Sequence, residues 1–148
     1  MIFVDWTSPP NHKLFNEAFF SYLSKNHDHK IFIFSKKLII KKTNCVFKKS
    51  KENRFWRFLD VLKICISMRN KPIFFITYDP LLLPLIKLFS KKIHTYEHNT
   101  VPEKMINKHT FFQFIFFKNI KINTHSKGQR NFLLKFKQDA TYLGPPLF

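Results

Sequence analysis

The hydrophobic positions of the chain follow two periods that alternate along its length. Short apolar or alternating runs predict strands; Ile31 and Ile33, for example, alternate with Phe32 and Phe34. Such runs occupy residues 1–6, 30–35, 45–47, 73–78, 92–97, 119–124 and 140–143. Between most of them, apolar residues recur at the three- and four-residue spacing of a helix that covers a core. We therefore expect strands and helices to alternate.

The predicted helices have apolar faces that can be assigned residue by residue. These positions are Leu14, Phe15, Ala18, Phe19, Tyr22 and Leu23 in the first helix, and Phe55, Leu59, Leu62 and Ile66 in the helix over residues 55–68. Asp79-Pro80 introduces a Leu-rich helix that either starts late or kinks, because Pro84 lies within it. We expect residues 103–117 to form a further helix, and Ser126 fits a capping box at the start of the last one.

Strands that alternate with helices predict right-handed βαβ units and hence a mostly parallel sheet. The expected fold class is α/β, a Rossmann-like sheet with helices on both faces. A length of 148 residues suits one such domain, which we expect to span residues 1–148. In sheets of this kind ligands bind beyond the carboxyl ends of the strands, so function is expected in the loops that follow them.

Polar residues follow the predicted strands at these ends. They are Ser8-Pro9-Pro10-Asn11, Tyr78-Asp79, Glu97-His98-Asn99, Thr124-His125-Ser126 and, after the last strand, Gly144-Pro145-Pro146. A parallel sheet brings such loops to one edge. Hydroxyls, amides, an imidazole and free helix N-termini there suit hydrogen bonding to a sugar or a phosphate.

Three strings in these loops resemble a known family. Residues 77–99 (TYDPLLLPLIKLFSKKIHTYEHN), 123–133 (NTHSKGQRNFL) and 142–146 (YLGPP) together resemble the acceptor domain of the retaining GT-B glycosyltransferases grouped as family 4. The resemblance covers most of the chain and rests on the order and spacing of the strings. It implies one half of a GT-B fold. It also implies transfer of a sugar from a nucleotide-sugar donor to a glycan or lipid-linked acceptor, in polysaccharide or cell-surface glycan biosynthesis.

The resemblance also implies particular site residues. In that family the His after the fifth strand lines the interdomain cleft near the transferred sugar, which gives His98 a catalytic role and places Asn99 beside it as a substrate-binding residue. Ser126, which opens the helix after the sixth strand, is implied to bind substrate, although a helix N-cap alone would explain a Ser there. His125 and Asp79 are weaker candidates.

The chain departs from the family pattern in two places. Where a Gly-rich first loop is common, it has Ser8-Pro9-Pro10-Asn11, and proline lacks the N–H that a phosphate cradle needs. We expect Pro10 and Asn11 to bind acceptor instead. The family's second, donor-binding domain has no counterpart in residues 1–148, so we expect no transfer by this chain alone and a donor-binding domain or subunit as partner. No cofactor or metal is expected; the nucleotide-sugar is a substrate.

The charge of the chain suggests a second partner. The formal net charge is +17, and 22 of the 26 basic residues are Lys. Residues 30–51 hold eight Lys and no acidic residue, a pattern that favours an anionic membrane surface. The apolar runs are too short or too interrupted to cross a bilayer. Without a secretory leader, the expected location is cytoplasmic, with peripheral binding at the inner face of the cell membrane.

Two alternatives stay open. A basic nucleic-acid-binding module would need exposed aromatics among Lys or Arg; Arg54-Phe55-Trp56-Arg57 is the one candidate, and helical packing explains its aromatics more simply. The Lys-rich composition also argues against nucleic acid as a partner, because Arg is preferred for contacts with phosphates and bases.

The chain could instead be a degenerate transferase remnant. Motifs of hydrolases, P-loop proteins and zinc proteases do not occur, and Cys45 and Cys65 predict neither a disulfide framework nor a zinc site.

Overall fold

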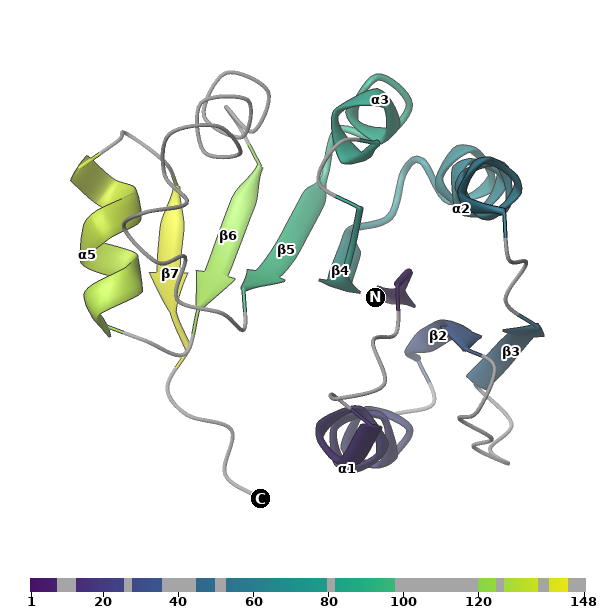
Figure 1. Cartoon of the computed structure of the whole chain (residues 1–148), viewed down its shortest axis with the longest axis horizontal. Coiled ribbons are helices and arrows are strands. Elements are labelled where there is room, and N and C mark those ends of the chain that lie inside the picture. The colour runs from purple at the N-terminus through teal and green to yellow at the C-terminus, as the bar shows by residue number, and fades with distance from the viewer. Residues whose placement is uncertain are drawn as a thin grey trace.

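The computed structural model describes residues 1–7, 13–25, 28–35, 45–49, 53–79, 82–97, 120–124, 127–135 and 139–143. In this part of the chain, seven strands form one sheet in the order β3-β2-β1-β4-β5-β6-β7 (Figure 1). The strands are β1 (Ile2–Asp5), β2 (Lys30–Ser35), β3 (Cys45–Lys49), β4 (Ile73–Thr77), β5 (Ile93–Glu97), β6 (Lys121–Thr124) and β7 (Ala140–Tyr142). Every neighbouring pair is parallel.

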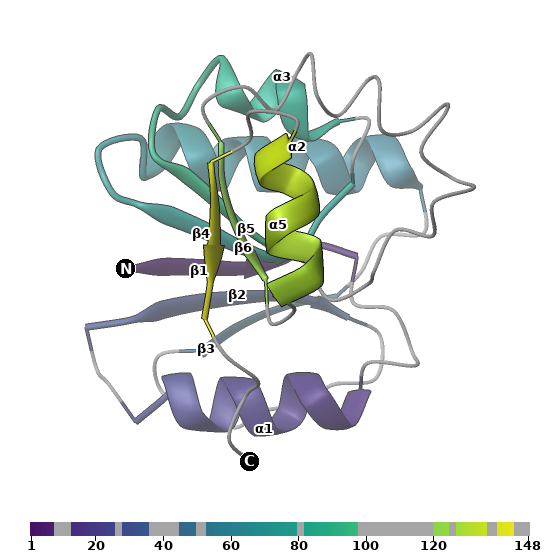
Figure 2. The same cartoon turned by 90° about the vertical axis from the view of Figure 1, so that its left-hand side faces the viewer.

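Helices cover both faces of this sheet. The described helices are α1 (Lys13–Leu23), α2 (Arg54–Ser67), α3 (Leu83–Lys87) and α5 (Lys127–Lys135). Figures 1 and 2 show α1 below the sheet and α2 and α3 side by side above it, while α5 lies against the β6–β7 end. The fold is therefore α/β and Rossmann-like, as the alternating periods predicted.

The element order agrees with the sequence prediction wherever the structure describes it. Each predicted strand is present, and each boundary falls within two residues of the expected one. The short helix α3 begins only at Leu83, with Pro84 in its first turn, so the late start is the alternative that occurs. The helix predicted over residues 103–117 and the predicted cap at Ser126 lie outside the described residues.

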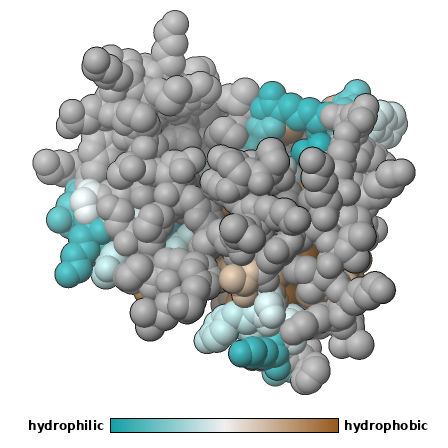
Figure 3. Space-filling model, turned by 60° about the horizontal axis from the view of Figure 1, so that its bottom comes forward, coloured by the Kyte–Doolittle hydropathy of each residue, from teal (hydrophilic) through white to brown (hydrophobic). Residues whose placement is uncertain are grey.

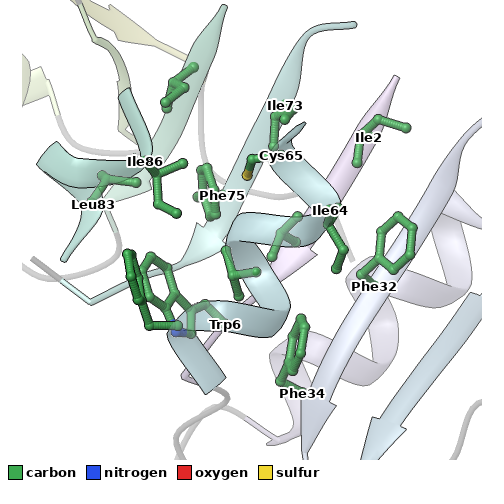
Figure 4. Close-up of a cluster of buried hydrophobic side chains, with 14 of the residues drawn as sticks. Ile2, Trp6, Phe32, Phe34, Ile64, Cys65, Ile73, Phe75, Leu83 and Ile86 are labelled. Atoms are coloured by element: carbon green, nitrogen blue, oxygen red, sulfur yellow. The ribbon is translucent and has the colours of Figure 1, made fainter. Parts of the chain in front are cut away.

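Two apolar clusters fill the space between the sheet and its helices. The larger one lies beneath α2 and α3 and includes Trp6, Val61, Phe75 and Ile86, all at most 1% exposed (Figure 4). The smaller one lies on the α1 side and includes Phe20. Burying an aromatic or branched side chain of this size contributes roughly 1.5–3 kcal/mol, so these clusters hold the sheet and helices together.

The predicted inner face of α2 was wrong. Phe55 and Ile66 are 58% and 47% exposed, and Leu59 and Leu62 only border the core. The buried residues of α2 are Phe58, Val61, Ile64 and Cys65. Helix α2 carries more apolar positions than one face can hold, so two adjacent stripes at helical spacing could have faced the core. Contact with the sheet buries the stripe that the sequence analysis did not choose.

The inner face of α1 needs a smaller correction. Phe20 and Leu23 are buried and Phe19 is partly buried, whereas Ala18 is exposed and Tyr22 is 69% exposed. The inward direction is therefore set by Phe20, which the predicted stripe omitted. Phe19 also faces the sheet and stacks on Tyr96 of β5, with 6.4 Å between ring centroids.

Figure 3 turns toward the viewer the side of the molecule that carries α1 in Figure 1. The described residues at this surface are mainly hydrophilic, and hydrophobic ones show mostly in recesses between them. Within the described part of the chain, none of the helices has the length and apolar character needed to span a membrane.

Candidate functional site

The centre of the carboxyl edge lies between β1 and β4. From β1 the chain builds outward to β2 and β3, and from β4 it builds in the opposite direction to β5, β6 and β7. The connections after these two central strands therefore diverge. In open parallel sheets such a switch point is where ligands bind, so the residues at the ends of β1 and β4 define the candidate site.

Asp5 and Thr77 join the two strand ends. They face each other in register after a shift of pairing between Val4 and Asp5. The Thr77 hydroxyl donates a hydrogen bond to Oδ1 of Asp5, and its Oγ1 accepts the backbone N–H of Thr7 at 3.0 Å. The backbone N–H of Trp6 donates to the carbonyl of Thr77 at 3.1 Å. Asp5 is fully buried, so this polar junction fixes where the loop after β1 departs.

Asp79, two residues beyond β4, is bound by Arg54. The Arg54 side chain lies at the first position of α2 and donates through Nε and Nη2 to the two carboxylate oxygens. This bidentate geometry is the strong form of an ion pair. The hydrogen bond and charge of Asp79 raise the pKa of the Arg54 guanidinium, partly offset by desolvation. Asp79 is 8% exposed, whereas the Arg54 side chain is 56% exposed.

Asp79 also organises the turn that leads into α3. Its Oδ1 accepts the backbone N–H of Leu82 at 3.3 Å, and its carbonyl accepts the N–H of Leu83 at 2.9 Å. Asp79 thus caps the chain ahead of α3, while the residue at the N-cap position itself, Leu82, has no side-chain cap. These bonds give Asp79 a structural role that accounts for its identity without a ligand.

The neighbouring strands β5 and β6 bring buried polar groups toward the same edge. Asn123 donates through Nδ2 to the carbonyl of Thr95 at 3.0 Å, and Thr124, at the end of β6, is fully buried. Among the described residues, the buried Thr95 hydroxyl has no hydrogen-bond partner. Burial also raises the pKa of Tyr96. The Asn123 side chain therefore ties β6 to β5 shortly before the two strands end.

The predicted site residues His98, Asn99, Ser126, Pro10 and Asn11 all lie outside the described residues, as does His125. The strands that lead to them are described. Strand β5 ends at Glu97, immediately before His98, and β6 ends at Thr124, two residues before Ser126. Glu97 and Thr124 are register partners, so the two motif loops start from adjacent positions on the sheet.

Sequence reasoning missed the residues that organise the switch point. Asp5 was counted only as part of the apolar run over residues 1–6, and Arg54 was considered only with its aromatic neighbours. A carboxylate that ends a buried strand was the available signal for Asp5. Nothing in the local sequence pairs Arg54 with Asp79, because the contact depends on how α2 lies over β4.

Within the described ranges, no three His, Cys, Asp or Glu side chains are grouped as metal ligands would be. The described edge offers hydrogen-bonding groups: the buried junction of Asp5 with Thr77, the Asp79 carboxylate bound by Arg54, and the strand ends after which the polar segments of the sequence follow. Comparison of the chain with protein-family models, with curated proteins and with solved structures found no match in any of the three.

Proposed function

We propose that this chain is the acceptor-side half of a retaining GT-B sugar transferase. It would bind a glycan or lipid-linked acceptor while a nucleotide-sugar is held by a second, donor-binding half. The observation that carries the proposal is the shared edge: β5 and β6 end side by side, and the His98-Asn99 and His125-Ser126 segments that resemble the family follow them directly. The switch point between β1 and β4 lies on the same edge.

In this proposal the chain orients substrate and the donor half supplies the chemistry. His98 and Asn99 hydrogen-bond the sugar being transferred, and Ser126, Pro10 and Asn11 shape the acceptor side. Retaining transfer passes through an oxocarbenium-like state and needs positive groups on the leaving diphosphate, which would come from the donor half. That half is either a further part of a longer polypeptide or a separate subunit.

The first test is the mass of the native polypeptide in its source cells, measured by immunoblot with an antibody raised to this segment. A product of about twice this length leaves room for a second domain, as the proposal requires, and moves donor-binding work to the longer protein. A product of 17.9 kDa directs the search to a separate donor-binding subunit. If no such subunit co-purifies, the result favours a degenerate remnant of a transferase over a working half of one.

The acceptor role can be tested on the chain itself by ligand-observed NMR against glycan fragments. We expect His98→Ala and Asn99→Ala to weaken binding about tenfold or more, the loss of one or two good hydrogen bonds. His29→Gln is the matched control, because His29 directly precedes β2 and so lies at the opposite edge of the sheet. Equal loss in all three variants, or turnover of a nucleotide-sugar by the purified chain alone, would contradict the proposal.

A nucleic-acid-binding role is a second candidate because one expectation against it was wrong. Phe55 and Trp56 are 58% and 52% exposed rather than packed in the core. Exposed rings beside basic residues can stack on bases. One observation argues against this role: the Arg54 guanidinium already binds the Asp79 carboxylate. This role would be favoured if the chain bound a single-stranded oligonucleotide, if that binding fell steeply with salt, and if Trp56→Ser abolished it.

The proposed location is the cytoplasm, at the inner face of the cell membrane. The Lys-rich residues 30–51 support this location through attraction to acidic lipid. Lipid-linked acceptors are held at such a surface, so the location and the proposed substrate class agree.

A further inference from the structure

The outer side of α2 and α3 carries an unusual concentration of exposed apolar side chains. We call this surface the α2–α3 face. Its exposed apolar residues are Phe55, Trp56 and Ile66 on α2, and Leu85, Leu88 and Phe89 on α3 and the turn that ends it. Elsewhere in the described part of the chain, large exposed apolar residues are scattered singly, as Tyr22 on α1 and Leu134 on α5 are.

The exposed side chains of α2 lie on its outer side, and Trp56, one residue beyond Phe55 on the helix, contacts the Phe55 ring with 5.9 Å between centroids. Helices α2 and α3 cover the same face of the sheet (Figure 2). In Figure 4, Ile64 of α2 projects toward the β2 side with Phe32, and Cys65 toward the β4 side with Phe75. Each further residue turns about 100° in the same sense, so Ile66 lies on the flank of α2 that borders α3. Phe55, three turns earlier on the same stripe, lies on that flank too.

The exposed residues are surplus to the fold. The inner positions of both helices are already filled, by Val61 and Cys65 on α2 and by Leu83 and Ile86 on α3, all fully buried. Leu88 is 77% exposed and contributes little to the core. A cluster of large apolar groups that the core does not need is typical of a surface with a partner.

The charges on this surface define the chemistry of the partner. Residues 53–72 and 82–92, which contain α2, α3 and their flanking turns, hold eight basic residues and one acidic residue, Asp60. Lys63 on α2 and Lys91 and Lys92 in the turn after α3 are exposed. Exposed apolar side chains on segments of basic charge match a bilayer with acidic headgroups, where apolar groups enter the acyl boundary and Lys remains among the phosphates.

Two other occupants fit less well. A second copy of the chain would bring two strongly basic surfaces together, and like charges would repel. A nucleic acid would make use of Phe55 and Trp56 but leave the aliphatic Ile66, Leu85 and Leu88 without a role, because bases stack on rings rather than on branched chains.

We propose that the α2–α3 face docks onto an anionic lipid bilayer. Phe55, Trp56, Leu85, Leu88 and Phe89 insert at the headgroup boundary, and the lysines contact lipid phosphates. The first turn of α2 also reaches the candidate site through the Arg54 contact with Asp79, so docking brings the carboxyl edge to the membrane. This inference names a different surface from residues 30–51 and does not depend on the transfer activity.

The position of the two tryptophans allows a direct measurement. Trp6 is buried, at 1% exposed, whereas Trp56 is 52% exposed on the proposed surface. Vesicles of equal parts phosphatidylcholine and phosphatidylglycerol should shift Trp56 fluorescence to the blue in a Trp6→Phe variant, and brominated acyl chains should quench it. If Trp6→Phe folds poorly, the same quenching can be followed in the unmodified chain, with Trp56→Phe as the blank.

Co-sedimentation with the same vesicles tests the residues. Leu88→Ser and Trp56→Ser should each weaken binding about tenfold or more, because each removes a side chain from the acyl boundary. Tyr22→Ser is the matched control: Tyr22 is as exposed but lies on α1, across the sheet, and its loss should leave binding unchanged. A Lys91→Glu, Lys92→Glu double variant should lose binding to anionic vesicles, and unmodified protein should not bind phosphatidylcholine alone.

Four results would overturn the inference: no blue shift of Trp56, equal loss with Tyr22→Ser, a Trp56-dependent dimer in solution, or a Trp56 shift with an oligonucleotide and none with vesicles. Transfer to a water-soluble acceptor, assayed with the donor-binding half, separates this inference from the proposed function. Lost docking with intact transfer contradicts only the docking surface. Intact docking without transfer contradicts only the transferase.

Discussion

The guanidinium of Arg54, at the start of α2, binds the carboxylate of Asp79, just beyond β4, through two parallel N–H donors. The contact ties the helix that covers one face of the sheet to the edge where the motif loops begin. The same carboxylate accepts the N–H of Leu82, so one nearly buried acidic group connects α2, β4 and the turn before α3.

Removing this contact should loosen the edge without unfolding the domain. Arg54→Met leaves the Asp79 carboxylate with fewer donors, and we expect it to lower the free energy of unfolding by about 1–2 kcal/mol. The loss stays small because the Arg54 side chain is more than half exposed and its charge is screened. Urea unfolding followed by circular dichroism measures the change. Lys63→Met, an exposed substitution on the same helix, is the control and should change stability by less than about 0.5 kcal/mol.

Thr77→Val should break the junction between β1 and β4. The substitution keeps the shape of the side chain but removes the donor to Asp5 and the acceptor of the Thr7 N–H. Because Asp5 is fully buried, we expect a loss of about 1–3 kcal/mol and faster hydrogen exchange at the Thr7 amide. Thr141→Val on the edge strand β7 is the comparison. Unchanged exchange at Thr7 in Thr77→Val would show that the hydroxyl does not hold the loop.

The two cysteines should differ in reactivity. Burial raises the pKa of the Cys65 thiol to about 12, so almost none of it is thiolate near neutral pH. Cys45 is partly exposed. In the folded protein we expect a thiol reagent to modify Cys45 quickly and Cys65 only as the protein unfolds. Labelling followed by peptide mass spectrometry, repeated in denaturant, distinguishes the two sites. Rapid modification of Cys65 without denaturant would mean that α2 separates readily from the sheet.

Stability should decrease on the acid side because of His94. Burial lowers its pKa in the folded protein, with a further decrease from Lys121 and an opposing contribution from Asp139. A lowered pKa means that the folded state favours the neutral ring. This stability is present above the ordinary pKa of 6.5 and is lost as the pH falls through the folded value. The test is the free energy of unfolding measured against pH: the acid-side slope should be shallower in His94→Gln than in the unmodified protein.

Local sequence patterns were sufficient for the order of the described elements but not for the rotation of the helices. The apolar runs around Ile31 and Ile73 were sufficient to assign strands there, because alternating or continuous runs of β-branched residues strongly favour extended backbone. In α2 both the Phe55–Ile66 stripe and the Phe58–Cys65 stripe are apolar, so periodicity could not choose between them. The choice depends on the side chains of the sheet, which come from distant segments.

The candidate site could likewise be predicted only in part. The carboxyl edge of the sheet could be predicted, because strand ends can be assigned from local periodicity and parallel strands end at the same edge. It could not identify the Asp5–Thr77 junction or the Arg54–Asp79 pair, since each joins residues that become neighbours only after the sheet has formed. The roles of His98, Asn99, Ser126, Pro10 and Asn11 stay predictions.

The place of β1 in the sheet has a consequence for how the chain folds. Strand β1 can pair with β2 early, but its other neighbour is β4, and the bond between Asp5 and Thr77 joins residues 72 positions apart. Closing a loop of that length costs entropy before any contact repays it, and slow folding accompanies such long-range pairing. During synthesis, the first strand must therefore wait with one edge unpaired until β4 has emerged, and in that interval chaperones or a neighbouring nascent chain can bind it.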